Sequence, residues 1–239
     1  MTQPLFREDA YAREAAAVVT ARTDEGGIVL DRTVFYPTGG GQPGDAGWIV
    51  WQGRRLAIAT AVKGEGAAIV LVPAEEGPLP EVGTEVVQSL DWARRHRHMR
   101  LHTALHLLSV ALPFGVTGGQ ISARHGRLDF DMAEAPQDRD GIEETLNGFV
   151  ARDAPVRERW ITEAALDAEP ALVKTMSVQP PRGAGDIRLV RIGEDDALID
   201  LQPCGGTHVA RTGEIGQLRL GKIEKKSRQN RRVYLHLDG

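Results

Sequence analysis

The stretch that decides the fold is residues 93–112, ARRHRHMRLHTALHLLSVAL. It contains neither glycine nor proline and ends directly before Pro113, so it predicts one long helix with a defined end. Leucines recur along it every three or four residues, which places them on one helix face that packs against a core. These leucines are Leu101, Leu105, Leu108 and Leu112.

The same helix carries half of a metal-ligand pattern. His102 and His106 stand four residues apart and therefore project from one helix face. Far along the chain, its one cysteine, Cys204, precedes His208 by four residues in the motif CGGTH. A thiolate with three imidazoles is a preferred zinc ligand set, and both halves have compact ligand spacing. Taken singly, a helical histidine pair is commonly structural and a lone cysteine is commonly a small buried hydrophobe.

The chain lacks the sequence signatures of several enzyme classes. Thr103 follows the first histidine where a zinc protease of the common type has its general-base glutamate. The chain has no Gly-x-Ser-x-Gly elbow, which disfavours a serine hydrolase. The glycine-rich run at residues 39–47 lacks the Lys-Ser/Thr of a phosphate loop. That run is either a hairpin turn or a backbone surface on which a substrate lies closely. In the second reading its contacts are Thr38, Gly39, Gly40, Gly41 and Gln42.

The net charge of the chain limits how it can bind nucleic acid. The 239 residues are 41% hydrophobic and 26% charged, as in globular proteins, and the net charge is −4. Any nucleic-acid site is therefore a local basic patch. Two basic segments stand out, residues 94–98 and 222–232, and they read either as solvated faces or as phosphate contacts. The predicted tRNA contacts are Arg95, Arg97, Lys222, Lys225, Lys226, Arg228, Arg231 and Arg232. Few aromatic residues are present, so backbone and shape contacts suit the site better than base stacking.

The chain divides into a β-rich half and an α+β half, and the pattern changes near Leu90. The predicted domains are residues 1–90, a small β-barrel, and residues 91–239, in which helices flank a largely antiparallel sheet. Before the barrel, an alanine-rich segment at Tyr11–Ala21 predicts a helix. Barrel strands are predicted at Ile28–Leu30, Val34–Tyr36, Trp48–Trp51, Leu56–Val62, Ala67–Val72 and Val86–Val87.

In the second half, glycines predict a turn at Gly115–Gly119, and residues 127–132 read as a strand. Ile142, Leu146 and Phe149 mark a second helix, and Thr162 is the expected N-cap of a third. A Pro/Gly-rich loop is expected at Gln179–Gly185. The remaining strands are predicted at Ile187–Ile192, Ala197–Leu201, Leu218–Lys226 and Val233–Leu237.

Cysteine content and hydropathy bear on the compartment. One cysteine cannot form an internal disulfide, and no apolar run approaches the length of a membrane span. The first residues do not read as a secretory signal. We therefore expect a reduced, cytoplasmic protein with no membrane partner, and no protein partner is evident from the sequence.

Four motifs, in this order, resemble the alanyl-tRNA editing proteins, relatives of the editing domain of alanyl-tRNA synthetase. They are FYPTGGGQPGD (35–45), RHRHMRLHTALHLL (95–108), CGGTH (204–208) and TGEIG (212–216). The similarity runs from about Arg22 onward. It matches the longer form of the family, which implies a β-barrel before an α+β editing domain with zinc between a helix and the sheet.

This resemblance implies an activity and a ligand set. The family hydrolyses the ester of wrongly charged tRNA for alanine, chiefly with serine and sometimes with glycine, and leaves alanyl-tRNA intact. His102, His106, Cys204 and His208 match its zinc ligands. The zinc would activate a bound water for attack on the ester, polarise the ester carbonyl, or hold the substrate in place, and the sequence leaves these roles open. The protein's general base is not identified, and the partner is the acceptor end of the tRNA. Editing domains for threonine share the paired motif, so serine-charged tRNA for threonine is an alternative substrate.

Selectivity for serine over alanine requires a polar side chain in the site, because alanine is smaller than serine and cannot be excluded by size. A polar group that bonds the serine hydroxyl is left unpaired by alanine, and such a site discriminates strongly. The predicted residues are Thr103, Gln120 and Ser122. Two other functions compete with editing: a zinc-stabilised tRNA-binding module without catalysis, and a zinc hydrolase of small molecules.

Overall fold

The computed structural model describes residues 1–176 and 185–238, which form two compact units, Met1–His98 and Met99–Gly239. The division falls inside helix α1 (Trp92–Ala111), which begins in the first unit and ends in the second. The domain boundary predicted near Leu90 stays a prediction. The loop predicted at Gln179–Gly185 lies outside the described residues, apart from Gly185.

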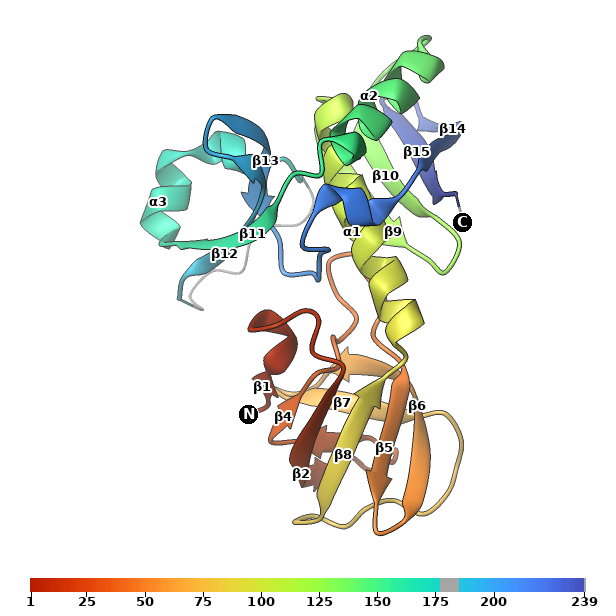
Figure 1. Cartoon of the computed structure of the whole chain (residues 1–239), viewed down its shortest axis with the longest axis vertical. Helices are drawn as coiled ribbons and strands as arrows, with labels where there is room; N and C mark the ends of the chain where they lie inside the picture. Colours follow the sequence, from red (N-terminus) through yellow and green to blue (C-terminus); the bar gives the residue numbers. More distant parts are fainter. Residues whose placement is uncertain (177–184, 239) are drawn as a thin grey trace. The chain divides into compact units, whose positions relative to one another are not determined.

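Six strands of the N-terminal unit close into a barrel, and this confirms the predicted fold class (Figure 1). In barrel order they are β2 (Glu14–Arg22), β3 (Ile28–Leu30), β7 (Ile69–Pro73), β6 (Arg54–Lys63), β5 (Gly47–Trp51) and β8 (Glu85–Leu90). Neighbouring strands are antiparallel throughout the ring. Closure leaves no unpaired edge within the ring. Outside it, β1 (Gln3–Pro4) and β4 (Arg32–Thr33) pair in parallel, next to a 3-10 turn, η1 (Leu5–Arg7).

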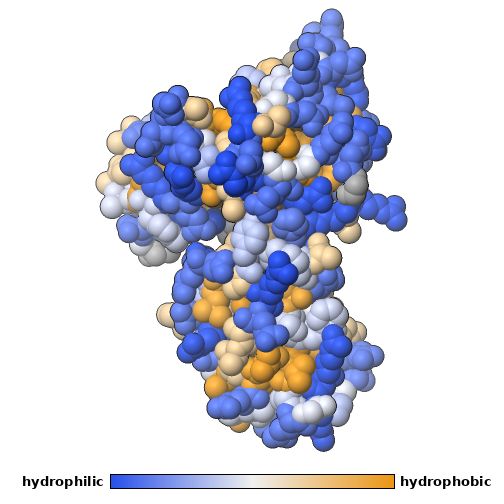
Figure 2. Space-filling model, viewed as in Figure 1, coloured by the Kyte–Doolittle hydropathy of each residue, from blue (hydrophilic) through white to orange (hydrophobic). Residues whose placement is uncertain are grey.

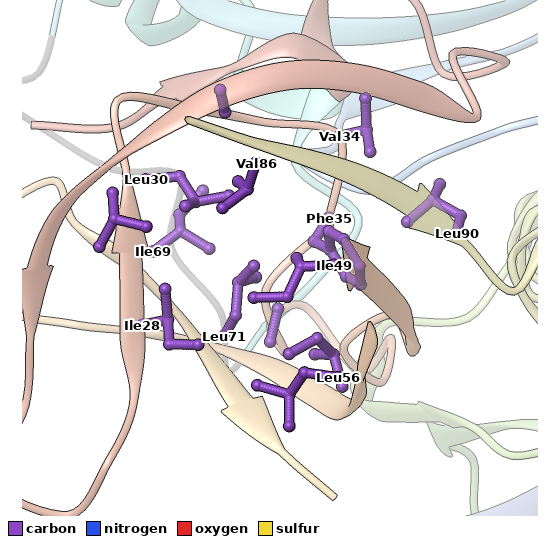
Figure 3. Close-up of a cluster of buried hydrophobic side chains, with 14 of the residues drawn as sticks. Ile28, Leu30, Val34, Phe35, Ile49, Leu56, Ile69, Leu71, Val86 and Leu90 are labelled. Atoms are coloured by element: carbon purple, nitrogen blue, oxygen red, sulfur yellow. The ribbon is translucent and has the colours of Figure 1, made fainter. Parts of the chain in front are cut away.

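Aliphatic and aromatic side chains fill the barrel (Figure 3). Along β5 and β8 buried residues alternate with more exposed ones, as a pleated strand requires, whereas all three residues of β3 are buried. Side chains with at most 1% of their surface exposed include Ile28, Leu30, Val34, Phe35, Ile49 and Leu71. Burial of this apolar surface is the main stabilisation of the unit.

Two predictions in this unit are wrong. The alanine-rich segment is strand β2 and not a helix, because it pairs with β3 on one side and β8 on the other and points Ala17 and Val19 inward. Tertiary pairing thus outweighs the helix propensity of alanine. Val34–Tyr36 is buried but belongs to no strand. Side chains satisfy its backbone instead, since the amides of Val34 and Tyr36 donate to Gln88 Oε1 and Asp45 Oδ2.

The start of α1 is fastened to the barrel unit by Arg95, whose side chain is fully buried. Its Nε donates to both carboxylate oxygens of Asp45 at 2.9–3.0 Å. Its remaining nitrogens bond Asp45 again and the carbonyl oxygens of Ala10 and Val34. A guanidinium with this many partners satisfies both its charge and its donors in the interior.

The C-terminal unit contains two antiparallel sheets and the second part of α1 (Figure 1). One sheet has the order β14 (Leu218–Ser227), β15 (Asn230–Leu237), β10 (Gly126–Asp131) and β9 (Val116–Ile121). The other comprises β11 (Val156–Ile161), β12 (Ile187–Glu194) and β13 (Ala197–Pro203). Every residue of α1 from Leu101 to Ser109 is buried, so the helix forms the core of this unit, and the predicted leucine face is confirmed.

Both further helices lie where the sequence predicts them. Helix α2 (Arg139–Ala151) contacts β14 through Asn147, whose amide bonds both the N–H and the C=O of Leu218 at 2.9 Å. Helix α3 (Glu163–Ala168) has Thr162 as its N-cap and leads to a 3-10 turn, η2 (Pro170–Leu172). The turn predicted at Gly115–Gly119 is wrong: residues 116–121 form β9, and β10 pairs with it.

The surface is mixed in character. Figure 2 shows apolar patches on the N-terminal unit. In the same unit Val50 and Val87 are exposed and are paired neighbours on β5 and β8. Scattered apolar side chains of this kind are normal on protein surfaces. Among the described residues, no helix combines the length and the hydropathy that crossing a membrane requires.

Candidate metal centre

Helix α1 places two imidazoles side by side in the interior of the C-terminal unit. The helix begins after Asp91, whose carboxylate accepts from the Arg94 N–H, as an N-cap does. It then continues without glycine or proline to Ala111. His102 and His106, one helical turn apart, are both buried, and their ring centroids lie 5.6 Å apart.

The other half comes from the loop after β13. Arg188 on β12 holds this loop by donating to the carbonyl oxygens of Cys204 (2.6 Å) and Gly206 (3.0 Å), while it also pairs with Glu158. Cys204 Sγ lies 3.4 Å from His102 Nε2 and 3.3 Å from His208 Nε2. The loop thus turns its thiol and its imidazole toward the helix.

The four predicted ligands meet in one group. One ligand atom each from His102, His106, Cys204 and His208 lies within 4.8 Å of the others; the three histidines are buried and the cysteine is partly buried. This group could hold a metal ion. Imidazole nitrogens and a thiol sulfur are donors that suit zinc better than magnesium or calcium, which prefer oxygen.

The charges around the sulfur favour its ligand form. Burial opposes ionisation of Cys204, but the neighbouring His102 and His208 outweigh it and hold the pKa of the thiol well below its usual value. Burial also lowers the pKa of His208 to about 3, against the attraction of Cys204. A thiolate and a neutral imidazole are the forms that bind metal.

A polar network that the sequence analysis missed lies behind His106. Asp200 Oδ2 is 2.8 Å from His106 Nδ1 and accepts from Gln202 Nε2 at 2.7 Å, while Asp200 Oδ1 is 2.5 Å from Lys174 Nζ. Burial would raise the pKa of Asp200, but His106 and Lys174 lower it to about 2. Burial likewise opposes protonation of His106, yet its bonds to Asp200 and Cys204 raise its pKa to about 9.

The strand pattern contained a signal for this network. Asp200 and Gln202 precede Cys204 at spacings of two residues, and alternate residues of a strand share one face. A buried acid on the face that leads to a ligand cysteine is therefore expected to point toward the same site. Lys174 carried no such signal, because its contact with Asp200 joins distant parts of the chain.

Thr103 was predicted to bind substrate, but its hydroxyl is used inside the protein. The side chain is fully buried and donates to the Met99 carbonyl oxygen at 3.0 Å. It also lies 3.1 Å from His208 Nδ1 and accepts from the Val209 N–H at 3.3 Å. Thr103 therefore contacts a proposed ligand from behind.

Gln120 and Ser122 belong to the β9–β10 hairpin. Gln120 is exposed, and its Oε1 accepts from Arg127. The Ser122 hydroxyl donates to the His125 carbonyl oxygen and accepts from the amides of Arg124 and His125, so it caps its own turn. Neither of these bond sets includes one of the four grouped residues.

The glycine-rich segment forms a tight turn in the N-terminal unit. Gly39 and Gln42 exchange both backbone hydrogen bonds across Gly40 and Gly41, whose φ angles are 56° and 78°. Positive φ at both central residues defines a type I′ turn, which favours glycine. Gly40 and Gly41 are exposed at its tip, Gln42 is buried, and Thr38 Oγ1 accepts from the Gly44 N–H.

The predicted basic contacts differ in exposure. Arg95 is buried with Asp45, so we leave it out of the proposed tRNA contacts; Arg97 is half-buried. Arg231 is buried and bonds backbone carbonyl groups, and Arg232 makes a two-pronged bond with Asp129. Lys222 is exposed and pairs with Glu224. The other exposed cations, at the tip of the β14–β15 hairpin, are Lys225, Lys226 and Arg228.

Two family profiles match the chain. Residues 187–234 match the "threonyl and alanyl tRNA synthetase second additional domain", and residues 9–94 match "tRNA synthetases class II (A)". The first range contains the loop with Cys204 and His208, and the second contains the barrel. Both profiles describe parts of aminoacyl-tRNA synthetases.

Full-length relatives narrow the class further. The chain is 34% identical to an alanyl-tRNA editing protein AlaX-M of Saccharolobus solfataricus over 98% of both chains, and 31% identical to one of Methanosarcina acetivorans over 99% of both. It is also 37% identical to alanine–tRNA ligase of Pyrobaculum calidifontis, of which it spans 25%. The chain belongs to the alanyl-tRNA editing protein family.

Proposed function

We propose that this protein hydrolyses the ester bond of tRNA for alanine that carries serine or glycine, and that it spares alanyl-tRNA. The observation that carries the proposal is the buried group of three imidazoles and one thiol in a chain of this family. His102, His106, Cys204 and His208 would hold zinc. Bound there, zinc supplies Lewis acidity toward an ester carbonyl or a water molecule.

The surrounding side chains limit which residues select the amino acid. Thr103 and Ser122 use their hydroxyls for bonds within the protein. Gln120 is exposed, and we retain it in the proposal, although its Oε1 accepts a hydrogen bond from Arg127. A group that bonds the serine hydroxyl would distinguish serine from alanine by its unmet hydrogen bond.

For tRNA we propose phosphate contacts at the tip of the β14–β15 hairpin, from Lys225, Lys226 and Arg228. Three exposed cations close together in an acidic protein form the kind of local patch that binds a phosphate backbone. Replacing all three with glutamine is expected to weaken tRNA binding and flatten its salt dependence. Arg157→Gln is the matched control, because this exposed arginine lies on β11 and pairs with Glu194.

The exposed tip at Gly40 and Gly41 is a proposed contact for the tRNA end, with Thr38, Gly39 and Gln42 shaping the turn. Its support is the absence of side chains at the tip, which lets another backbone approach closely.

The experiment that tests the function measures amino acid released from charged tRNA. Serine-, glycine- and alanine-charged tRNA for alanine are incubated with purified protein, and serine-charged tRNA for threonine is run alongside. We expect rapid release of serine, slower or equal release of glycine, and retention of alanine. Cys204→Ala and His106→Ala should abolish release and metal content, while His236→Ala, an imidazole change elsewhere in the unit, should keep both.

Each alternative has its own outcome in this assay. Persistence of every ester, together with tRNA and zinc binding, would leave the binding module as the better account. If serine is released from tRNA for threonine as fast as or faster than from tRNA for alanine, editing of serine-charged tRNA for threonine would be the better account. Hydrolysis of simple esters with no preference for tRNA would favour the small-molecule hydrolase.

A further inference from the structure

We propose that Thr103 and Asp200 are positioning residues of the metal centre. Each accepts a hydrogen bond from the Nδ1–H of one imidazole, so that His208 and His106 both present Nε2 to the metal. The inference rests on the proposed metal centre and is independent of whether the protein hydrolyses tRNA esters.

The hydrogen-bond inventory of Thr103 fixes the tautomer of His208. A threonine hydroxyl has one proton to donate and two lone pairs that accept. The proton is directed to the Met99 carbonyl oxygen at 3.0 Å, and one lone pair accepts from the Val209 N–H at 3.3 Å. The contact with His208 Nδ1 at 3.1 Å is therefore one in which Nδ1–H donates. The other nitrogen, Nε2, is then the basic one, and it is the atom that lies 3.3 Å from Cys204 Sγ.

Asp200 assigns the same tautomer to His106. A carboxylate only accepts hydrogen bonds, so His106 Nδ1 donates to Oδ2 across 2.8 Å. Oδ2 also accepts from Gln202 Nε2, and Oδ1 faces the Lys174 ammonium at 2.5 Å. A metal would therefore bind His106 through the other nitrogen, Nε2, in place of any proton there.

The carboxylate itself is held in one orientation. Asp200 is 2% exposed, and both its oxygens have partners on different parts of the unit. Gln202 Nε2 additionally reaches Ser109 Oγ at 3.2 Å, and this hydroxyl donates to the backbone carbonyl oxygen of His106 at 2.8 Å. The acid that holds the His106 ring is thus linked to the same turn of α1 that carries the ring.

Lys174 adds the charge that balances this arrangement. Its ammonium is partly exposed while Asp200 is buried, so the pair brings a cation to a carboxylate that would otherwise stand unpaired in the interior. Its backbone carbonyl oxygen accepts from the Val116 N–H, which anchors the lysine to β9. Removal of such partners behind a metal-ligating histidine typically lowers metal affinity about 10- to 100-fold.

The direct test reads the two imidazoles by NMR. Protein labelled with ¹⁵N-histidine is loaded with zinc, and long-range ¹H–¹⁵N correlations identify which ring nitrogen carries the proton. We expect Nδ1–H and metal-bound Nε2 for His106 and His208. A metal-bound Nδ1 in either residue would overturn the assignment for that residue.

A second test measures metal affinity by competition with a chromophoric chelator and by the cobalt(II) spectrum. Asp200→Asn, Asp200→Ala and Thr103→Val are expected to weaken binding about 10- to 100-fold and to shift the d–d bands. Thr103→Ser, which retains the hydroxyl, should restore both. Asp129→Asn is the matched control, because that carboxylate, like Asp200, pairs with cations of this unit, here Arg127 and Arg232.

The results separate positioning from simple structural support. If Asp129→Asn lowers stability to urea as much as Asp200→Asn does and only the latter weakens metal binding, the positioning role stands. Unchanged affinity and spectra in folded Asp200 and Thr103 variants would overturn it. If the Asp200 variants fail to fold, the NMR measurement on the unsubstituted protein still decides. A protein that binds no metal overturns the centre and this inference together, and the tRNA assay with chelator then tests hydrolysis alone.

Discussion

At the scale of single residues, the structure separates arginines that hold the fold from cations that are available to a partner. Arg95 and Arg97 are two residues apart in one basic segment, yet the first is completely buried and the second is half-buried. A charge run in a sequence gives no information about which of its members has a buried carboxylate opposite. Arg95 is buried because it pairs with Asp45, which lies far from it in the chain.

Arg95→Met is predicted to destabilise the N-terminal unit by about 3–5 kcal/mol, because it leaves the Asp45 carboxylate buried without its cation. Urea unfolding measures this loss. Arg94→Met, at a half-buried neighbour, should cost far less. A wild-type unfolding curve for Arg95→Met, with weakened tRNA binding, would contradict the structural role and return Arg95 to the tRNA contacts.

The four proposed metal ligands show how much of the site could be predicted from the sequence. Two pairs with a spacing of four residues were sufficient to predict the group formed by His102, His106, Cys204 and His208. Of the residues behind them, Lys174 could not be predicted, because it meets Asp200 only through the tertiary fold, whereas Asp200 shares the strand face that leads to Cys204. The substrate role of Thr103 stays a prediction; its helix position could be predicted from the sequence, but the bonds of its hydroxyl to Met99 and His208 could not.

At the scale of elements, periodicity predicted most helices and strands, and the errors share a cause. The alanine-rich β2 and the glycine-containing β9 both oppose their local propensities. Each is a strand because it pairs with neighbours, β2 with two strands of the barrel and β9 with β10. Pairing partners that lie far apart in the chain are the part of the fold that local patterns do not specify.

The turn at Gly40 and Gly41 is predicted to require glycine for its conformation. Alanine at either position would adopt a positive φ at a cost of about 1–2 kcal/mol. Thermal unfolding of Gly40→Ala and Gly41→Ala measures this cost, with Gly77→Ala as a control because nothing surrounds its added methyl group and its φ is not positive. If the variants are stable but release serine slowly, the proposed tRNA contact is supported; unchanged stability and release would contradict both.

The pairing of β10 with β15 is predicted to weaken in acid. Burial opposes ionisation of Asp129, but the bonds to Arg232 and Arg127 outweigh it and lower its pKa. A carboxylate whose pKa is lower in the folded state stabilises that state above the unfolded pKa of about 3.9 and loses this effect as the pH falls further. The stability difference between the protein and Asp129→Asn should therefore be constant near pH 6 and shrink below about pH 4. A difference independent of pH would exclude the ion pair as its source.

At the scale of the whole molecule, the ligand group belongs entirely to the unit Met99–Gly239. Metal removal is therefore predicted to destabilise that unit selectively. At a free metal concentration about 100 times the Kd, binding contributes about 2.7 kcal/mol to the state that binds it. Hydrogen exchange with and without chelator should show faster exchange in β12 and β13 and unchanged exchange in β5 to β8. Helix α1 is left out of this comparison because it is shared between the units.

Equal acceleration in both sets of strands would show that the two units unfold together, and no acceleration in either would argue against a metal centre. Zinc added back should restore the original rates, which distinguishes metal loss from damage by the chelator.

The placement of the ligands on α1 and on the loop after β13 has a consequence for how the centre is assembled on the ribosome. The two histidines of the helix are synthesised long before the cysteine, and alone they offer only half of a binding site. A growing chain therefore offers all four side chains only after the loop with Cys204 and His208 has emerged. If the group holds a metal ion, its site is completed late in synthesis, and a chain that ends before Cys204 would offer only two of the four side chains.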